Sequence, residues 1–470
     1  MRSPLVMAVA VLMALAGSFL PGRAQDDAAR LRPSAGRSPC EFRSIAVLPV
    51  SDTKALGYSN NTRCVVDAAG NAWIAVRSKH AGEYSICLVR ATPPWRDGMP
   101  VEQTWLEDRD SLQLSALPQR PAAIAATADG SIHMAWYGGS TANPEHQIRY
   151  ARFTTGGSTH IEEEQTPFTV LGFADVAASL PGPIDAWQEH AAIALGPDGR
   201  AYLAWEARDP QRRALDGTPR PGIAYATRGA DGVWSASGKL TRPPYLQVDG
   251  SIPGQSRPSI LVDTSGKAHV LSYGAVHGTQ QLLYGWTRVG RGFFGWDQVA
   301  PSAGDQRSVA AALDGSGRLH VVWREGLPSG SAGAASMAIY YSVRGTDGHW
   351  LSPVRLTRDD ENASTPAIGV GDSTVSVAWI AWTPGAVNSL GQVDNGFPLD
   401  NSTVEGRLEM ASSALAPAHF EPPIALDPGP ASYPCWGVSA RDSSPPLVWT
   451  RRDAATGVVT LRLGWCGRGR

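Results

Sequence analysis

The sequence carries almost no net charge, has few cysteines and lacks long apolar runs beyond residue 20. Its 470 residues have a formal net charge of −2. No global basic field exists to displace counterions, which argues against a general nucleic-acid-binding protein. No later segment is long enough to cross a bilayer, so we expect no stable membrane insertion. Turn formers abound instead, with 50 Gly and 36 Pro, which is typical of many short strands joined by turns.

The N-terminus has the features of a targeting segment. Arg2 supplies a positive charge, residues 5–20 form an apolar run, and residues 22–24 have the small-x-small pattern of a cleavage site. We therefore expect a signal peptide at residues 1–24 and a flexible leader at residues 25–38. The expected location of the mature protein is secreted or periplasmic.

Cysteine is scarce, and its five positions are informative: Cys40, Cys64, Cys87, Cys435 and Cys466. No CxxC or paired-histidine spacing is present, so we expect neither a metal nor another cofactor. Export permits disulfides, and four of these residues lie toward the two ends of the chain. We expect bonds Cys40–Cys466 and Cys64–Cys435, with Cys64–Cys87 as the alternative to the second.

One sequence pattern recurs along the chain at intervals of roughly 50–70 residues, a length typical of β-propeller blades. It consists of a small apolar strand, an Asp/Gly turn and a second strand that ends in an aromatic residue. The best copy has its turn at residues 314–317. The seven copies end at Trp73, Trp136, Trp205, Tyr273, Trp323, Trp379 and Trp449. An all-β propeller of four-stranded antiparallel blades follows, with seven blades favoured and six as the alternative.

The two ends of the chain are expected to form one blade together. After the last copy only two further strands are recognisable, whereas the apolar run 45–50 near the start has no blade of its own. We expect this N-terminal strand to close the ring, which makes residues 39–467 a single propeller domain. Repetition also assigns His133, His269 and His320, which share one position in the repeat, to structure rather than catalysis.

Polar residues that do not belong to the repeat cluster around the first and second strands of the blades. Arg63, Arg120, Arg257 and Arg307 precede first strands, and His190 occupies the matching place of another blade. Guanidinium groups gathered at one mouth would repel one another unless they hold an anion. A second set follows the second strands: Arg77, Tyr137, Glu206, Tyr273, Arg324 and Glu325. The alternative is structural, with each arginine bridging to a nearby carboxylate such as Glu206 or Glu325.

The turns at residues 230–234 and 346–350 resemble shortened Asp-boxes, the marker of the sialidase-like (BNR/Asp-box) propeller superfamily. That resemblance implies an arginine-bound sugar carboxylate. The superfamily's Arg-Ile-Pro signature is absent, and Arg120-Pro121 and Arg257-Pro258 only partly match it. Residues 189–199 show a weaker similarity to seven-bladed polysaccharide lyases acting on uronic acids. This second resemblance implies His190 or Tyr137 as the base, with Arg120 and Arg257 stabilising the charge on the substrate.

We therefore expect a secreted propeller that recognises an anionic glycan containing sialic or uronic acid. The sequence leaves open whether the protein also cleaves that glycan, as a glycoside hydrolase or a polysaccharide lyase. The candidate catalytic residues are His190, Tyr137, Glu206 and Glu325. The candidate substrate-binding residues are Arg63, Arg77, Arg120, Arg257, Arg307, Arg324 and Tyr273. The alternative is a non-catalytic propeller that binds a glycan or a protein partner, since a fold does not determine function.

Overall fold

The computed structural model describes most of the chain after residue 40. The described residues are 41–57, 62–80, 82–106, 119–127, 129–138, 147–154, 160–164, 188–213, 219–232, 256–276, 279–287, 293–326, 337–383, 405–415, 419–439 and 445–467. The expected signal peptide, leader and Cys40 lie outside them. Within these ranges no helix has the length and apolar character needed to cross a lipid bilayer.

The described chain is all-β, with one short 3-10 helix, η1 (Thr53–Ala55), which confirms the expected fold class. The first sheet contains β2 (Cys64–Val66), β3 (Ala72–His80), β4 (Glu83–Ala91), β5 (Val101–Trp105) and β25 (Val438–Ser439). The second contains β6 (Ala123–Ala126), β7 (Ile132–Gly138), β8 (Gln147–Thr154) and β9 (His160–Glu164). The third contains β10 (Gln188–Leu195), β11 (Ala201–Arg213) and β12 (Pro219–Arg228).

Three further sheets complete the described structure. The fourth contains β13 (Ser256–Val262), β14 (Ala268–Val276), β15 (Thr279–Thr287) and β16 (Phe293–Gln298). The fifth contains β17 (Gln306–Leu313), β18 (Leu319–Gly326), β19 (Met337–Arg344) and β20 (Val354–Arg355). The last contains β21 (Asn362–Val370), β22 (Thr374–Trp382), β23 (Gly406–Ala414), β24 (Ile424–Trp436), β26 (Leu447–Arg452), β27 (Val459–Gly467) and β1 (Glu41–Val50).

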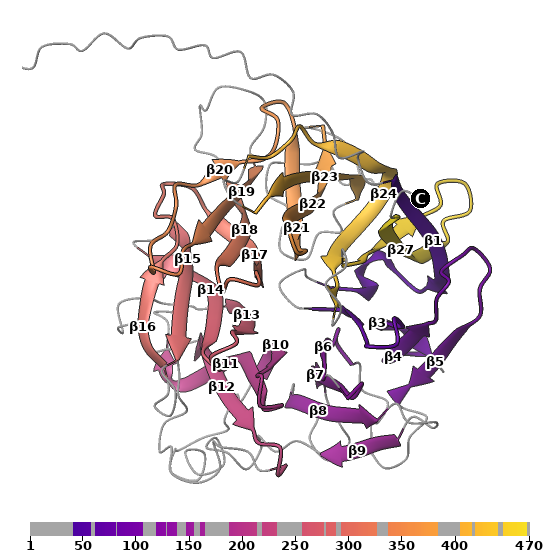
Figure 1. Cartoon of the computed structure of the whole chain (residues 1–470), viewed down its shortest axis with the longest axis horizontal. Helices are drawn as coiled ribbons and strands as arrows, with labels where there is room; N and C mark the ends of the chain where they lie inside the picture. The colour runs from indigo at the N-terminus through magenta and orange to yellow at the C-terminus, as the bar shows by residue number, and fades with distance from the viewer. Residues whose placement is uncertain are drawn as a thin grey trace, which may run out of the picture.

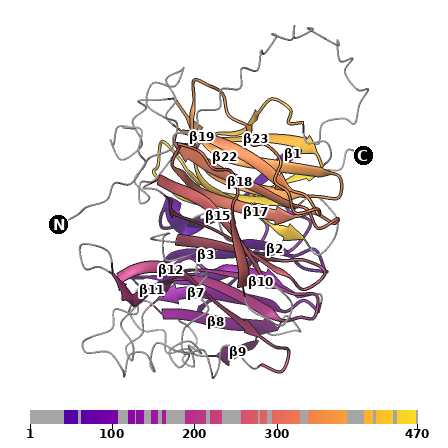
Figure 2. The ribbon, with the colours of Figure 1, turned by 90° about the vertical axis from the view of Figure 1, so that its left-hand side faces the viewer.

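The sheets follow one another around a common axis (Figures 1 and 2). The strand that opens each repeat faces a central cavity of about 560 Å³. Its lining comes from β2, β6, β10, β13, β17, β21 and the end of β24. These strands are rich in alanine and valine because only small side chains fit where many strands converge. Larger side chains, such as Trp136 and Trp323, are instead buried between neighbouring sheets.

The first and last described strands are hydrogen-bonded to each other. β1 pairs antiparallel with β27 from Glu41 opposite Gly467 to Val50 opposite Val459, and the two lie side by side in Figure 1. β24 changes partner along its length: its start pairs with β23, and its end pairs with β26. The last sheet therefore contains two groups of strands joined through β24.

The recurrent histidines connect neighbouring strands, as expected. His320 Nδ1 lies 2.7 Å from the Tyr341 hydroxyl and its Nε2 lies 3.1 Å from Asp314 Oδ2. His269 makes the corresponding contacts, and in the first sheet the Trp73 indole donates to Asp67 instead. Each set ties the turn aspartate to the second strand, and the histidine sets extend the tie to the third. We therefore assign these histidines to the scaffold.

Acid is expected to destabilise the protein through these buried histidines. Burial, followed by the positive charges of Arg152 and Arg228, lowers the pKa of His133 from 6.5 to about 4. The folded state therefore binds this proton less readily than the unfolded state, and stability is lost as pH falls below about 6.5 toward 4. We expect His133 alone to cost about 2 kcal/mol of unfolding free energy between pH 7 and pH 5.

Urea unfolding at the two pH values measures this cost. His133→Gln is expected to lose less stability on acidification than the wild type. His349→Gln, at an exposed turn position, serves as the matched control and is expected to behave like the wild type. Equal losses in all three proteins would contradict the assignment.

The cysteines correct one expected disulfide. Cys64, Cys87 and Cys435 are buried and belong to no disulfide, so the predicted Cys64–Cys435 bond and its alternative Cys64–Cys87 are absent. Cys435 Sγ instead accepts a hydrogen bond from the Arg63 backbone N–H at 3.4 Å. Burial, followed by the nearby Cys435, raises the pKa of the Cys64 thiol. Cys466 stands opposite Phe42 in the β1–β27 pairing, and the predicted Cys40–Cys466 bond stays a prediction because Cys40 lies outside the described residues.

Candidate functional site

Four of the strands that line the cavity begin with a bulge, and β24 has a bulge of the same kind between Ser432 and Cys435. The ladder register shifts in each, and one non-glycine residue has a positive φ. These residues are His190 (53°), Arg257 (49°), Ser308 (54°), Thr365 (48°) and Tyr433 (49°). Side chains seldom adopt this backbone region, and such residues concentrate at functional sites. The bulge places His190 and Arg257 at the same position of adjacent sheets.

The bulge also corrects the expected equivalence of the four arginines. Arg257 is itself the bulge residue, whereas Arg307 directly precedes the bulge residue Ser308. Arg63 directly precedes β2, and its backbone oxygen accepts from Ala75 N at 2.9 Å. A single inserted residue shifts the side chains relative to the sequence pattern, so matching by sequence alone aligned positions that differ in space.

The second strands contribute at one shared position. Arg77, Tyr137 and Glu206 occupy it in three successive sheets, each opposite an isoleucine of the third strand. Those isoleucines are Ile86, Ile148 and Ile223. Because the first and second strands are antiparallel, the ends of the second strands lie beside the starts of the first. Both sets of polar residues therefore reach the same end of the ring, which we call the mouth.

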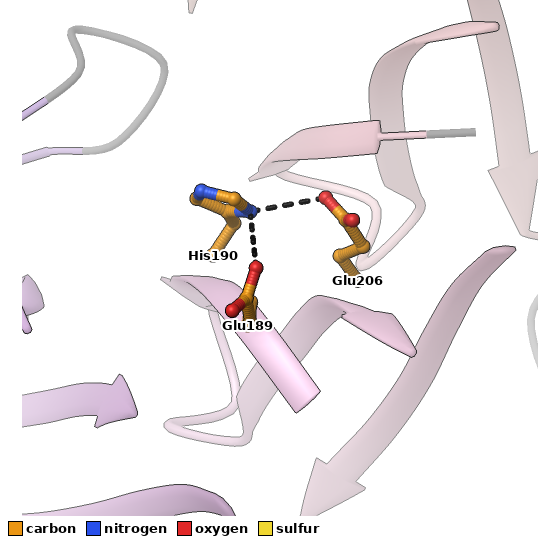
Figure 3. A group of neighbouring side chains, drawn as sticks. All are labelled: Glu189, His190 and Glu206. Atoms are coloured by element: carbon orange, nitrogen blue, oxygen red, sulfur yellow. Dashed lines mark hydrogen bonds and ion pairs between the residues drawn. The ribbon is translucent and has the colours of Figure 1, made fainter. Parts of the chain in front are cut away.

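His190, Glu206 and Glu189 form the centre of the candidate site (Figure 3). His190 Nδ1 lies 3.0 Å from Glu206 Oε2 and 3.9 Å from Glu189 Oε2. Nε2 lies on the opposite side of the ring from both carboxylates. Glu206 is held from the next sheet, because Ser256 Oγ donates to its Oε2 at 2.5 Å. The imidazole is thus oriented by a carboxylate that is itself oriented, which is the arrangement of a general base.

Tyr137 adjoins this cluster from the preceding sheet. Its ring centroid lies 5.6 Å from that of His190. Burial is the main cause that raises the pKa of the Tyr137 phenol, and Glu189 adds to it, whereas Arg120 and Arg257 oppose it. Burial would also raise the pKa of Glu206, but hydrogen bonds from His190 and Ser256 outweigh it and hold that pKa below its ordinary value. At neutral pH the site therefore contains a phenol and a carboxylate.

Arg63 brings a buried positive charge that no described residue neutralises. Its side chain is 3% exposed, and its Nε and Nη1 are buried without a hydrogen-bond acceptor. Burial lowers the pKa of this guanidinium to about 10, although Cys435 and Tyr137 act to raise it. Among the described arginines, Arg63 alone has two such nitrogens. A buried cation without an acceptor is costly, which points to an anionic ligand.

Other predicted residues lie in different surroundings. Arg307 forms an ion pair with Asp305 at 2.7 Å, as the structural alternative anticipated. The Glu325 carboxylate accepts from Trp323 Nε1 at 2.9 Å and from Ser302 Oγ at 2.6 Å, within its own sheet. Because these partners occupy both oxygens, Glu325 serves the scaffold rather than catalysis.

Two further candidates occupy the corresponding position of the second strand in the next two sheets. Tyr273 is buried on β14 opposite Leu282, and it pairs with Ser256 across the bulged ladder. Arg324 is buried on β18 opposite Ile339, and its Nη1 lies 3.7 Å from Met337 Sδ. Both residues therefore lie at the level of the mouth, in sheets that follow the one carrying His190.

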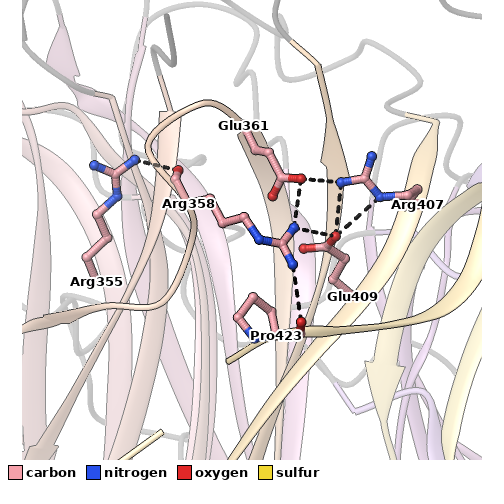
Figure 4. A network of polar contacts seen from close by, with 6 residues as sticks. All are labelled: Arg355, Arg358, Glu361, Arg407, Glu409 and Pro423. Carbon is pink, nitrogen blue, oxygen red and sulfur yellow. Dashed lines mark hydrogen bonds and ion pairs between the residues drawn. The ribbon is translucent and has the colours of Figure 1, made fainter. Parts of the chain in front are cut away.

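In a second arginine cluster, by contrast, glutamates neutralise the charge of the guanidinium groups (Figure 4). Arg358 contacts Glu361 at 2.9 Å and Glu409 at 3.2 Å, and Arg407 contacts both glutamates, with 3.0 Å to Glu409. Here charges of both signs meet in one network between the β17–β20 sheet and β23. Such a network stabilises the junction and leaves no excess positive charge for a ligand.

The His190 cluster also has the donor set of a cation site. The ligand atoms of Glu189, His190 and Glu206 all lie within 4.8 Å of one another. An imidazole and two carboxylates suit a divalent metal such as zinc or manganese. Incubation with these ions therefore tests the expectation that the protein needs no metal.

Three contributors had no distinctive signal in the sequence. Ser256, from another sheet, donates a hydrogen bond to Glu206. Arg77 stacks on the Tyr84 ring, and Lys54 lies close enough to Arg77 to interact with it. Only spatial neighbourhood reveals them, since none belongs to a recognisable motif.

Comparison with solved structures supports the fold. The polysaccharide lyase Uly1 has a TM-score of 0.50 and 9% sequence identity, covering 90% of this chain and 99% of that chain. The phage phi92 endosialidase has a TM-score of 0.46 and 8% identity, covering 92% and 70%. A protein of unknown function from Dyadobacter fermentans has a TM-score of 0.45 and 12% identity, covering 91% and 99%.

At the sequence level the chain stands apart. No family model and no curated protein sequence matches it. Identities this low bear on architecture and not on substrate. The chain accordingly shares its all-β fold with the polysaccharide lyase Uly1.

Proposed function

We propose that this protein binds a glycan containing uronic acid at the mouth and cleaves it by β-elimination. The observation that carries the proposal is the buried guanidinium of Arg63. Two of its nitrogens lack an acceptor in the described chain, and it interacts with Tyr137, the neighbour of the oriented His190. Arg63, with Arg120 and Arg257, would hold the sugar carboxylate. This neutralisation stabilises the negative charge that develops when the adjacent carbon loses its proton.

The remaining residues have defined roles in such a step. His190 Nε2 takes the C5 proton, and the electron pair forms the C4–C5 double bond as the C4–O bond breaks. Tyr137, kept as a phenol, donates its proton to the leaving oxygen. The proton on His190 then returns to Tyr137, whose ring is adjacent. Atoms and charges balance without an external reactant.

A hydrolysing sialidase is the second candidate, because Tyr137 lies near two glutamates and three arginines. A nucleophilic tyrosine needs a phenol that ionises readily. The raised pKa of Tyr137 favours the proton donor of an elimination instead. A non-catalytic binder would use the same arginines without turnover.

The proposal also covers the number of blades and the cellular location of the protein. We infer seven blades, with β1 as the outer strand of the blade that also contains the end of β24, β26 and β27. The pairing of β1 with β27 and the change of partner along β24 support this arrangement. We also propose export after cleavage behind Ala24, since polymeric glycans are found outside the cell.

Incubation of the mature protein with uronate polymers and sialylated glycans tests the function. We expect ultraviolet absorbance from an unsaturated uronate product, with no release of sialic acid. Retention of the polymer without product would support the binding alternative and contradict the lyase. Release of sialic acid would favour the hydrolase.

A further inference from the structure

A second group of cationic side chains lies beside the candidate site at the mouth. Arg77 occupies the position on β3 that Tyr137 occupies on β7 and Glu206 on β11. It therefore lies one sheet before Tyr137 along the ring. Arg77 is 9% exposed, and its Nε is buried without a hydrogen-bond acceptor in the described chain.

The surroundings of Arg77 hold its guanidinium in place. It stacks on the Tyr84 ring, 3.8 Å from the centroid, and its Nη2 lies 3.4 Å from Asp52 Oδ2. The Tyr84 hydroxyl donates to the same carboxylate oxygen at 2.6 Å. Asp52 also caps η1 by accepting from Lys54 N at 2.8 Å. A stacked planar guanidinium with a fixed orientation is suited to an oxyanion.

Several cationic side chains gather around the Asp52 carboxylate. Lys54, Arg77 and Arg120 lie close enough to interact, and Asp52 opposes them. Burial lowers the pKa of Lys54, Asp52 acts against this, and Arg77 and Arg120 lower it further. Repulsion among the three cations would be relieved by a bound anion.

Backbone contacts make this group continuous with the candidate site. Gln119 and Arg120 are consecutive, and their N–H groups donate to the carbonyl oxygens of Tyr84 and Tyr137, at 2.9 Å and 3.0 Å. Gly57, just after η1, packs so tightly that a Cβ there would lie 2.8 Å from Pro121 and 3.7 Å from Arg63 Nη2. The segment carrying Lys54 therefore adjoins Arg63.

We propose that Arg77 and Lys54 form a second anion-binding subsite, which takes an acidic group on a sugar next to the one held at Arg63. This inference rests on the proposed function and narrows its substrate class. The preferred glycan carries acidic groups on neighbouring sugars, and a chain with a single isolated acid binds more weakly.

Titration calorimetry with two probes tests the subsite in the full mature chain. The probes are D-glucuronate, with one carboxylate, and a galacturonic acid trimer, with one on every sugar. We expect the wild type to prefer the trimer. Arg77→Met should weaken trimer binding by about tenfold to a hundredfold, the equivalent of one charge-assisted contact, and leave glucuronate binding unchanged. Arg63→Met should weaken the binding of both probes.

Arg90→Met is the matched control. Arg90 lies in the same sheet, stacks over Trp73 at 5.2 Å and forms an ion pair with Glu102. It is opposite Trp73, near the start of β3, whereas Arg77 lies further along β3 toward the mouth. It should leave both affinities unchanged. If Arg77→Met does not fold, as judged by circular dichroism, Lys54→Met carries the test with the same expected selectivity.

The outcomes separate the two proposals. Equal effects of Arg77→Met on both probes, or none on the trimer, would overturn the subsite while the proposed function stands. A wild-type protein that binds neither probe would overturn both. A wild type that does not discriminate between the probes would also reject the subsite.

Discussion

Replacement of Arg63 by methionine is expected to weaken binding of the uronate glycan strongly while making the free protein no less stable. The guanidinium is buried, and two of its nitrogens have no acceptor in the described chain. Truncation of one member of a buried charge pair costs about 2–5 kcal/mol, so affinity should fall by about thirtyfold to several thousandfold. Burial of a charge without a partner is costly, so removal of that charge should not lower the free energy of unfolding.

The combination of these two effects identifies a binding residue. A scaffold arginine would lower the thermal midpoint when replaced, whereas Arg63→Met should leave it unchanged or raise it. Arg149→Met is the control, because Arg149 is also buried on β8 but has only one nitrogen without an acceptor. It should retain binding. A destabilised Arg63→Met that still binds glycan would show that Arg63 is structural.

Substitution of His190 should remove the chemical step and preserve binding. As a general base, His190 is expected to contribute about 10²–10⁴ in rate, so His190→Gln should lose turnover by that factor with little change in affinity. Tyr137→Phe should likewise reduce turnover, because it removes the proton donor. Product absorbance under saturating substrate measures both.

Glu206→Gln tests the orientation of the base. The carboxylate lies 3.0 Å from His190 Nδ1 and orients the ring. A neutral amide cannot hold the imidazole in the same way, so kcat should fall while glycan affinity changes little. Glu325→Gln is the matched control, since its partners are Trp323 and Ser302. It should change stability and leave kcat in place. An unchanged kcat in Glu206→Gln would remove Glu206 from the mechanism.

The scaffold was predictable because it repeats. The Asp/Gly turn and the buried aromatic residue of the second strand recur in several copies, and His269 and His320 make the same contacts with their turn aspartates. The class of the fold follows from hydrophobic alternation and turn chemistry, which act over a few residues. The assignment of the repeated histidines to structure follows from the same repetition.

The site was predictable only in part. His190, Tyr137 and Glu206 were identified as candidates because they depart from the repeat, and the structure brings them together. Glu325 and Arg307 depart from it as well, yet local partners bind them. Charge pairing depends on distances between strands that are far apart in the sequence, so the pattern could not separate the two groups.

The amino-acid sequence by itself determined that the chain is an all-β protein built from a recurring strand–turn–strand unit, because periodicity and turn residues act locally. Only the tertiary structure decided which arginines lack an acid, that Cys64 and Cys435 stay reduced, and that Arg77 lies beside the candidate site. The bulges before the first strands shift side chains by one position, and the ring joins residues that are more than a hundred positions apart. Whether a given arginine finds a neighbouring carboxylate therefore depends on how the strands assemble at the mouth, and no single segment of the chain determines it.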